Sequence, residues 1–437
     1  MLLRKFVSQR LAAYYSQPAN TVVGATTLAT STKSSIAFSS LLGELHWKYI
    51  YGNLYRKQQG QWLTPVELFK PYYSQVFANY ILQQLKTPLS SDCQYEAFEI
   101  VELGGGRGTN ARVILDTIKN HQPDTYHNHL LRYTIIDVSS SLQDLQRHTI
   151  LQDDGSDAGS HADKIHFRQV DLTDVAEGKQ YFFESTSESD NHERVRSFVI
   201  ALEMLDNLAH DKVRRQGKQL DSNVLLEEAR VVQDDSLMQQ EVFVPLEDPL
   251  LQTIMDVAPF YGVPISKQAT WVPSVACGLL MQLAKEKQLI DVIAADFDWL
   301  PPQDASPEGT TKHFPVHADG DPIVTSMDGV DRSSYLEASE DLLCDILFPT
   351  NFEKLSRFAK RVFQSENSSE SDTIVHVHKQ ADFLCRYGPE QIEQTSGWLT
   401  GFCPLLHDFS NCSVMTVANK PGLAVAGSRG PIKVKPR

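Results

Sequence analysis

The chain has 437 residues, of which 41% are hydrophobic and 22% are charged. This composition is ordinary for a globular protein and excludes a disordered or fibrous chain. The formal net charge of −15 argues against nucleic acid as a main partner, because phosphate contacts need clustered Lys and Arg. The six cysteines lack the spacing of a structural zinc site or a disulfide framework.

The N-terminal segment differs in composition from the rest of the chain. Residues 1–43 contain no Asp or Glu, carry four basic residues and are rich in Ser and Thr. Apolar residues recur at helical spacing from Leu3 to Tyr14. This pattern is typical of a mitochondrial transit peptide, so we expect residues 1–40 to direct import into the matrix. No apolar run reaches the length of a membrane span, and we expect none in the protein.

The remaining residues, 41–437, show the patterns of one α/β domain. Helical patterns dominate residues 41–90, and Thr64-Pro65 with Glu67 is a capping pattern that predicts the start of a helix. Strands are expected at residues 98–103, 133–138, 165–170, 197–202, 241–245, 291–298 and 413–418, and helices at 109–120 and from Ser141. Strands that alternate with helices predict a mostly parallel sheet with helices on both faces, a Rossmann-type core.

The chain has less regular patterns outside this core. We place the core at about residues 95–300, with polar loops such as 184–194 within it. A linker at 301–309 opens an insertion at about 301–380, and residues 381–420 add C-terminal elements. His376 and His378 alternate on one expected strand, but they lack a third nearby ligand, so no metal site is predicted.

A glycine loop follows the first expected strand. The sequence Glu102-Leu-Gly104-Gly-Gly106-Arg-Gly108 fits the pattern E/D-x-G-x-G-x-G. Glycines let backbone N–H groups approach a ligand, and the helix N-terminus attracts a carboxylate or phosphate. In a methyltransferase that anion is the carboxylate of S-adenosylmethionine, and Glu102 would face its ammonium group. A nicotinamide-dependent oxidoreductase is the alternative, but its G-x-G-x-x-G spacing would put the last glycine at Thr109.

Four acidic residues follow the other expected strands. Asp137 closes the second strand, where a carboxylate can bind ribose hydroxyls, and Asp171 follows the third, where it can meet the adenine amine. Both positions also suit a turn-forming Asp. Glu203 and Asp206 follow the fourth strand and would lie near the transferred methyl group. Carboxylates at that place suit a guanidinium acceptor, although both residues also suit the cap of a following helix.

Five segments resemble the MidA-like family of mitochondrial methyltransferases. They are residues 62–67 (WLTPVE), 102–109 (ELGGGRGT), 136–142 (IDVSSSL), 201–208 (ALEMLDNL) and 381–384 (ADFL). The resemblance implies a Rossmann-type, class I methyltransferase core with added helical elements, a matrix location and S-adenosylmethionine as cofactor. It also implies arginine methylation of a respiratory complex I subunit during assembly.

The resemblance assigns roles to matching residues. Gly104, Gly106 and Gly108 would bind the donor, Asp137 its ribose, and Glu203 and Asp206 would lie near the acceptor. The chain departs from the family at three places, where Gly105 replaces a Pro, Leu202 an Asn and Ala209 a Pro. These departures mark a divergent member and leave open a second function, that of a donor-binding but non-catalytic assembly factor.

Overall fold

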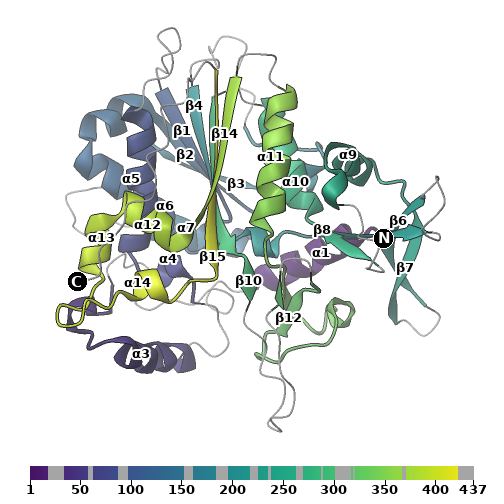
Figure 1. Cartoon of the computed structure of the whole chain (residues 1–437), viewed down its shortest axis with the longest axis horizontal. Coiled ribbons are helices and arrows are strands. Elements are labelled where there is room, and N and C mark those ends of the chain that lie inside the picture. Colours follow the sequence, from purple (N-terminus) through teal and green to yellow (C-terminus); the bar gives the residue numbers. More distant parts are fainter. Residues whose placement is uncertain are drawn as a thin grey trace.

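A seven-stranded sheet forms the centre of the computed structural model (Figure 1). The structure describes residues 1–17, 34–57, 63–86, 97–151, 161–183, 195–216, 225–234, 238–261, 269–286, 289–300, 316–317, 320–366 and 371–421. The predicted loop 184–194 and the linker 301–309 lie outside these residues. Within the described part of the chain, no helix has the length and apolar character needed to cross a membrane.

The strands of the sheet follow the order β14-β15-β9-β4-β1-β2-β3. Their bounds are β1 Ala97–Leu103, β2 Leu130–Asp137, β3 Ile165–Gln169, β4 Val195–Leu202, β9 Ile290–Phe297, β14 Ser371–Lys379 and β15 Cys412–Pro421. All neighbouring pairs are parallel except the two made by β15, which pairs antiparallel with β9 and β14. This arrangement confirms the predicted Rossmann-type sheet.

Helices cover both faces of the sheet, because successive strand residues point to opposite sides. In β4, Val199 and Ala201 pack into one apolar cluster, whereas Phe198 and Ile200 pack into the other. The first cluster includes α1 Leu3–Tyr15, α8 Leu172–Ala176, α9 Pro249–Val257, α10 Ser274–Glu286 and α11 Phe352–Glu366. The second includes α3 Glu44–Lys57, α4 Pro65–Leu68, α5 Tyr72–Lys86, α6 Thr109–His121, α7 Ser140–Leu151, α12 Gln380–Tyr387, α13 Pro389–Gln394 and α14 Pro404–His407. Figure 1 shows α5 to the left of the sheet and α10 and α11 to its right.

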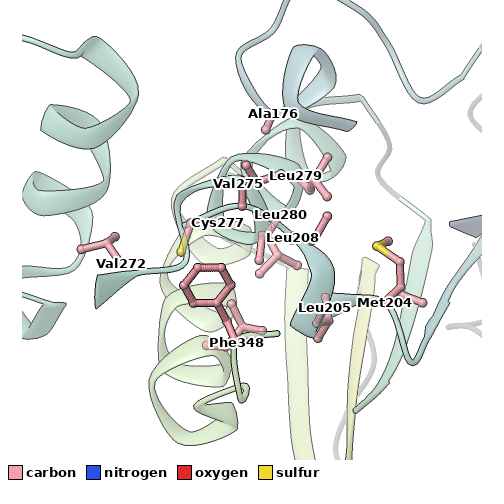
Figure 2. Packing of buried hydrophobic residues seen from close by; sticks show 14 of the residues in the cluster. Ala176, Met204, Leu205, Leu208, Val272, Val275, Cys277, Leu279, Leu280 and Phe348 are labelled. Atoms are coloured by element: carbon pink, nitrogen blue, oxygen red, sulfur yellow. The ribbon is translucent and has the colours of Figure 1, made fainter. Parts of the chain in front are cut away.

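Helix α10 packs unusually close to α8. A Cβ atom added to Gly278 of α10 would lie 2.7 Å from both the Cβ and the carbonyl oxygen of Ala176. Only a glycine permits this approach. Figure 2 shows Val275 and Leu279 of α10 beside Ala176 and Leu208, so the helix supports both α8 and the turn that follows β4.

A second, antiparallel sheet lies between β4 and β9 in the sequence. Its strand order is β7-β6-β5-β8, with bounds β5 Asp211–Gln216, β6 Leu225–Gln233, β7 Gln239–Pro245 and β8 Thr270–Val272. Two further hairpin-like pairs follow β9, namely β10 Trp299–Leu300 with β11 Val316–His317 and β12 Ile323–Ser326 with β13 Cys344–Leu347. The sequence predicted only the strand at 241–245 among these elements.

The boundary of the expected insertion needs correction. Residues 352–366 and 371–379 were placed in the insertion at 301–380, but they form α11 and β14, and β14 is an edge strand of the central sheet. The sequence analysis expected a strand at His376 and His378, but local alternation could not show that this strand pairs with β15 in the central sheet. The core therefore continues through β15 to the end of the C-terminal elements.

The N-terminal helix also differs from our expectation of a detachable transit segment. In α1, Leu3 and Val7 are fully buried, and Phe6 is 1% exposed. The helix packs against β13 and β6, and Figure 1 shows it in purple near β12. An amphipathic pattern is compatible with an import signal and with a helix packed in the fold, so the sequence alone could not distinguish the two. Import into mitochondria stays a prediction.

Candidate active site

A cavity of about 460 Å³ lies at the carboxyl ends of β1, β2 and β4. Its volume suits a small-molecule ligand, and the carboxyl edge of a parallel sheet is the usual place for one. The sequence-predicted site residues that line the cavity are Glu102, Gly104, Gly106, Asp137, Asp171, Glu203 and Asp206. Gly108 is not among the lining residues.

The glycine loop adopts a backbone that favours glycine. Gly104, Gly106 and Gly108 have φ angles of 67°, 50° and 83°. A Cβ atom on Gly106 would meet nothing within 4 Å, so this residue faces open space. A Cβ atom on Gly108 would lie 2.9 Å from the Cα of Gln146 in α7. Gly106 thus leaves room for a ligand, whereas Gly104 allows the close approach of the Met204 side chain and Gly108 allows close packing of α6 on α7.

Glu102 and Asp137 are held in fixed orientations at the ends of β1 and β2. Glu102 accepts hydrogen bonds of 2.8 Å from both Asn110 Nδ2 and the Tyr133 hydroxyl. Asp137 accepts one of 3.0 Å from Gln146 Nε2. Burial raises the pKa of Glu102 to about 7 and that of Asp137 to about 6. A cationic ligand beside either carboxyl group would favour its charged form.

Asp171 both lines the cavity and caps a helix. Its carboxylate accepts a hydrogen bond of 2.8 Å from the backbone N–H of Thr173 at the start of α8. The Ser8 hydroxyl of α1 lies 3.4 Å from the Asp171 carboxylate and 2.8 Å from the Thr173 hydroxyl. The turn-forming role that the sequence left open is therefore present, and it does not remove the side chain from the cavity.

Glu203 follows β4 in a strained conformation. Its φ angle of 54° makes it the one non-glycine residue with positive φ in the described part of the chain. Such strain occurs at sites where geometry matters more than stability. Glu203 Oε1 accepts a hydrogen bond of 3.3 Å from the backbone N–H of Val66, whereas Oε2 is buried without a partner. Burial and the neighbouring Asp296 raise its pKa well above the ordinary value.

Asp206 lies in the short helix η4 Leu205–Asn207. Its Oδ1 atom is buried without a hydrogen-bond partner, and burial together with Asp296 raises the pKa of the carboxyl group well above its ordinary value. The N-cap of η4 is Met204, which makes no side-chain capping bond. The alternative that Glu203 and Asp206 cap a following helix is therefore not what the structure shows.

Two further carboxylates near Asp206 were missed by the sequence analysis. Asp296, near the end of β9, accepts a 3.0 Å hydrogen bond from the Asp206 backbone N–H, and burial raises its pKa to about 7. Asp345 of β13 accepts a 2.9 Å bond from Asn207 Nδ2 and one of 3.2 Å from the Tyr15 hydroxyl of α1. The carboxyl-end rule applied to the predicted strand 291–298 could have found Asp296. No pattern in the sequence pointed to Asp345.

The lining of the cavity is strongly acidic. Its acidic residues are Glu67, Glu102, Asp137, Asp171, Glu203, Asp206, Asp345 and Asp408. Arg107 is the one Lys or Arg among the lining residues. No group of three or more potential metal ligands was found among the residues that the structure describes. An excess of carboxylates favours cations as ligands.

Comparisons with known proteins identify a family and a shared fold for this chain. A family model described as "Putative S-adenosyl-L-methionine-dependent methyltransferase" matches residues 76–368. A protein from Burkholderia thailandensis, crystallised with S-adenosyl-homocysteine, shares the fold with a TM-score of 0.53 at 13% identity, over 96% of this chain and 87% of that one. A native crystal structure of a protein of the same superfamily and organism gives 0.50 at 14% identity, over 80% and 79%. The search of curated proteins found no match.

Proposed function

The chain belongs to this family of S-adenosylmethionine-dependent methyltransferases, and we propose that it methylates a guanidinium nitrogen of an arginine side chain in a protein. The family-like segments support a subunit of respiratory complex I as the acceptor, during assembly in the mitochondrial matrix. The observation that carries the choice of a cationic acceptor is the pair of unpartnered carboxylate oxygens, Glu203 Oε2 and Asp206 Oδ1, in an acidic cavity.

The residues of the glycine loop fit the methyl donor. Gly104 and Gly106 line the cavity, and Gly106 leaves open space where the donor's amino-acid end can approach the backbone. Glu102 lies close enough to the loop to accept from an ammonium group, and Asp137 ends β2 where ribose hydroxyls bind in related folds. When bound, the donor supplies an electrophilic methyl group on a positively charged sulfur.

Glu203 and Asp206 suit the acceptor side of the reaction. A guanidinium offers five N–H donors in a planar fork, which carboxylates bind in defined orientations. As the new N–CH₃ bond forms and the S–CH₃ bond breaks, the nitrogen loses a proton. Glu203, whose pKa is raised by burial and by Asp296, is able to take that proton once the cationic guanidinium beside it favours its charged form. Alignment of donor and acceptor supplies most of the remaining rate enhancement.

A labelling experiment tests the proposed acceptor. The purified chain is incubated with labelled S-adenosylmethionine and a mitochondrial protein extract, and the labelled proteins are hydrolysed in acid. We expect methylarginine, and we expect the Glu203→Gln chain to form it about 100-fold more slowly. Label found only on another amino acid would contradict the arginine assignment while leaving the methyltransferase assignment intact.

The complex I subunit and the location are tested in cells. We expect mass spectrometry of complex I to show methylarginine in one subunit, and to show it lost in cells that lack this chain. An unchanged spectrum would contradict this acceptor. Cell fractionation tests the proposed matrix location. The support for this location is that residues 1–43 contain no Asp or Glu.

A non-catalytic assembly factor is the second candidate. Gly105, Leu202 and Ala209 all line the cavity, so the three departures from the family pattern lie within the site itself. Under this alternative the chain binds S-adenosyl-homocysteine in a calorimeter, yet the Asp206→Ala chain still rescues cells that lack the protein. Under our proposal that variant fails to rescue.

A further inference from the structure

Helix α1 is anchored in the fold by a buried cation. Arg4 is 2% exposed, and its guanidinium lies 2.9 Å from Asp211 Oδ2, 2.7 Å from Asp248 Oδ2 and 3.0 Å from Glu177 Oε1. These partners belong to β5, to the N-cap of α9 and to the end of α8. Loss of the helix would leave Asp211 and Asp248 buried without this cation, which is costly in a protein interior.

The other side of α1 forms part of the cavity wall. The α1 residues that line the cavity are Ser8, Leu11, Ala12 and Tyr15. Ser8 contacts Asp171 and Thr173, the residues at the start of α8. The helix therefore closes the cavity on the side where the sequence analysis placed the adenine end of the donor.

Tyr15 connects α1 to the acidic end of the cavity. Its hydroxyl group lies 3.1 Å from Asn207 Oδ1 and 3.2 Å from Asp345 Oδ2. Asn207 Nδ2 in turn donates to Asp345 Oδ1 at 2.9 Å. Since Asn207 follows Asp206 directly, this network fixes the segment that carries one of the two proposed acceptor-binding carboxylates.

We propose that α1 is a permanent wall of the methyl-donor site, and that Tyr15 is a positioning residue for Asp206 through Asn207 and Asp345. The functional protein therefore keeps residues 3–15, whatever compartment it occupies. The inference that α1 is a wall of the donor site is independent of which amino acid accepts the methyl group, whereas the role of Tyr15 rests on the proposed function.

A matched pair of substitutions on α1 tests the donor site. Ala12→Trp places a large ring in the cavity, whereas Gln9→Trp places the same ring on the exposed side of the same helix. We expect the first to weaken binding of S-adenosyl-homocysteine, measured by calorimetry on the full chain, by about tenfold or more. We expect the second to leave the Kd within about twofold of the wild type.

The melting temperature shows whether both variants fold. If Ala12→Trp does not fold, Ala12→Leu replaces it and should weaken binding by a smaller factor with a native melting temperature. Equal affinities for the position 12 variant and Gln9→Trp would overturn the proposal. Failure of the wild-type chain to bind S-adenosyl-homocysteine would overturn it as well.

Mass spectrometry of the native protein tests retention of the helix. Trypsin cuts after Arg10 and Lys33, so a retained N-terminus yields the peptide of residues 11–33. We expect this peptide in the protein purified from its own cells. A native N-terminus that begins beyond Leu3 would overturn the proposal, even if the purified full chain binds the donor.

Discussion

The two ends of the cavity differ in how completely their carboxylates are satisfied. At the donor end, Glu102 and Asp137 accept hydrogen bonds from fixed neighbours on their own and adjacent elements. At the acceptor end, Glu203 and Asp206 each keep one buried oxygen without a partner. Buried polar groups are normally paired, so the proposed function predicts that a cationic acceptor completes this end. Under that proposal the donor end is organised before binding, and the acceptor end is organised by binding.

The donor end should be most sensitive to backbone changes. Gly108→Val places a branched side chain at a φ of 83° and against the Gln146 backbone. We expect a loss of about 3 kcal/mol in the free energy of unfolding, from the strain and the clash together. Gly106→Ala, in open space, should cost only about 1 kcal/mol yet weaken S-adenosyl-homocysteine binding, because its methyl group enters the cavity. Chemical denaturation and calorimetry measure these effects, and equal stability losses would contradict the packing role of Gly108.

The acceptor end should be sensitive to charge instead. Glu203→Gln keeps the shape of the side chain but removes the proton acceptor and the negative charge. We expect kcat to fall by about 100-fold while the Kd for S-adenosyl-homocysteine stays within about threefold. Steady-state assays on a methyl-accepting protein and calorimetry measure the two quantities. If the affinity for S-adenosyl-homocysteine fell by the same factor as kcat, Glu203 would belong to the donor end, and the two ends would not differ in this way.

Asp296 gives the acceptor end a dependence on pH. Its folded-state pKa of about 7 lies above the ordinary value of 3.8, because the carboxyl group is buried. The neutral form therefore stabilises the fold at low pH, and this contribution is lost as the pH rises through about 7. The side chain of the Asp296→Asn chain stays neutral at every pH. The melting temperature of this chain minus that of the wild type should therefore rise from pH 5 to pH 8. If the melting temperatures of the two chains change equally between pH 5 and pH 8, Asp296 is not buried as a neutral acid.

The smallest effect is expected at Tyr15. Tyr15→Phe removes the hydroxyl group near Asn207 and Asp345 but keeps the ring that lines the cavity. We expect kcat to fall by about fivefold, the value of one hydrogen bond, with little change in donor Kd. A change in donor Kd with an unchanged kcat would assign Tyr15 to the donor end and not to the acceptor end.

The same contrast explains what the sequence could predict. The donor end comes from one continuous strand-loop-helix segment, so residues 102–108 and Asp137 were found from local patterns alone. Glu203 and Asp206 followed from the rule that sites lie at the carboxyl ends of strands. Asp345 comes from an irregular segment, and only the fold brings it to Asp206. Tyr15 was assigned to a transit peptide because an amphipathic pattern alone does not distinguish an import signal from a helix that packs against the rest of the fold.

The contact between Gly278 and Ala176 makes α10 a remote support of the donor pocket. Any side chain at position 278 must push α8 away, and α8 begins at Asp171 and Thr173 on the pocket wall. From its location alone, a substitution at position 278 would be interpreted as destabilising the protein core. Its measurable effect would instead be a weaker affinity for S-adenosyl-homocysteine.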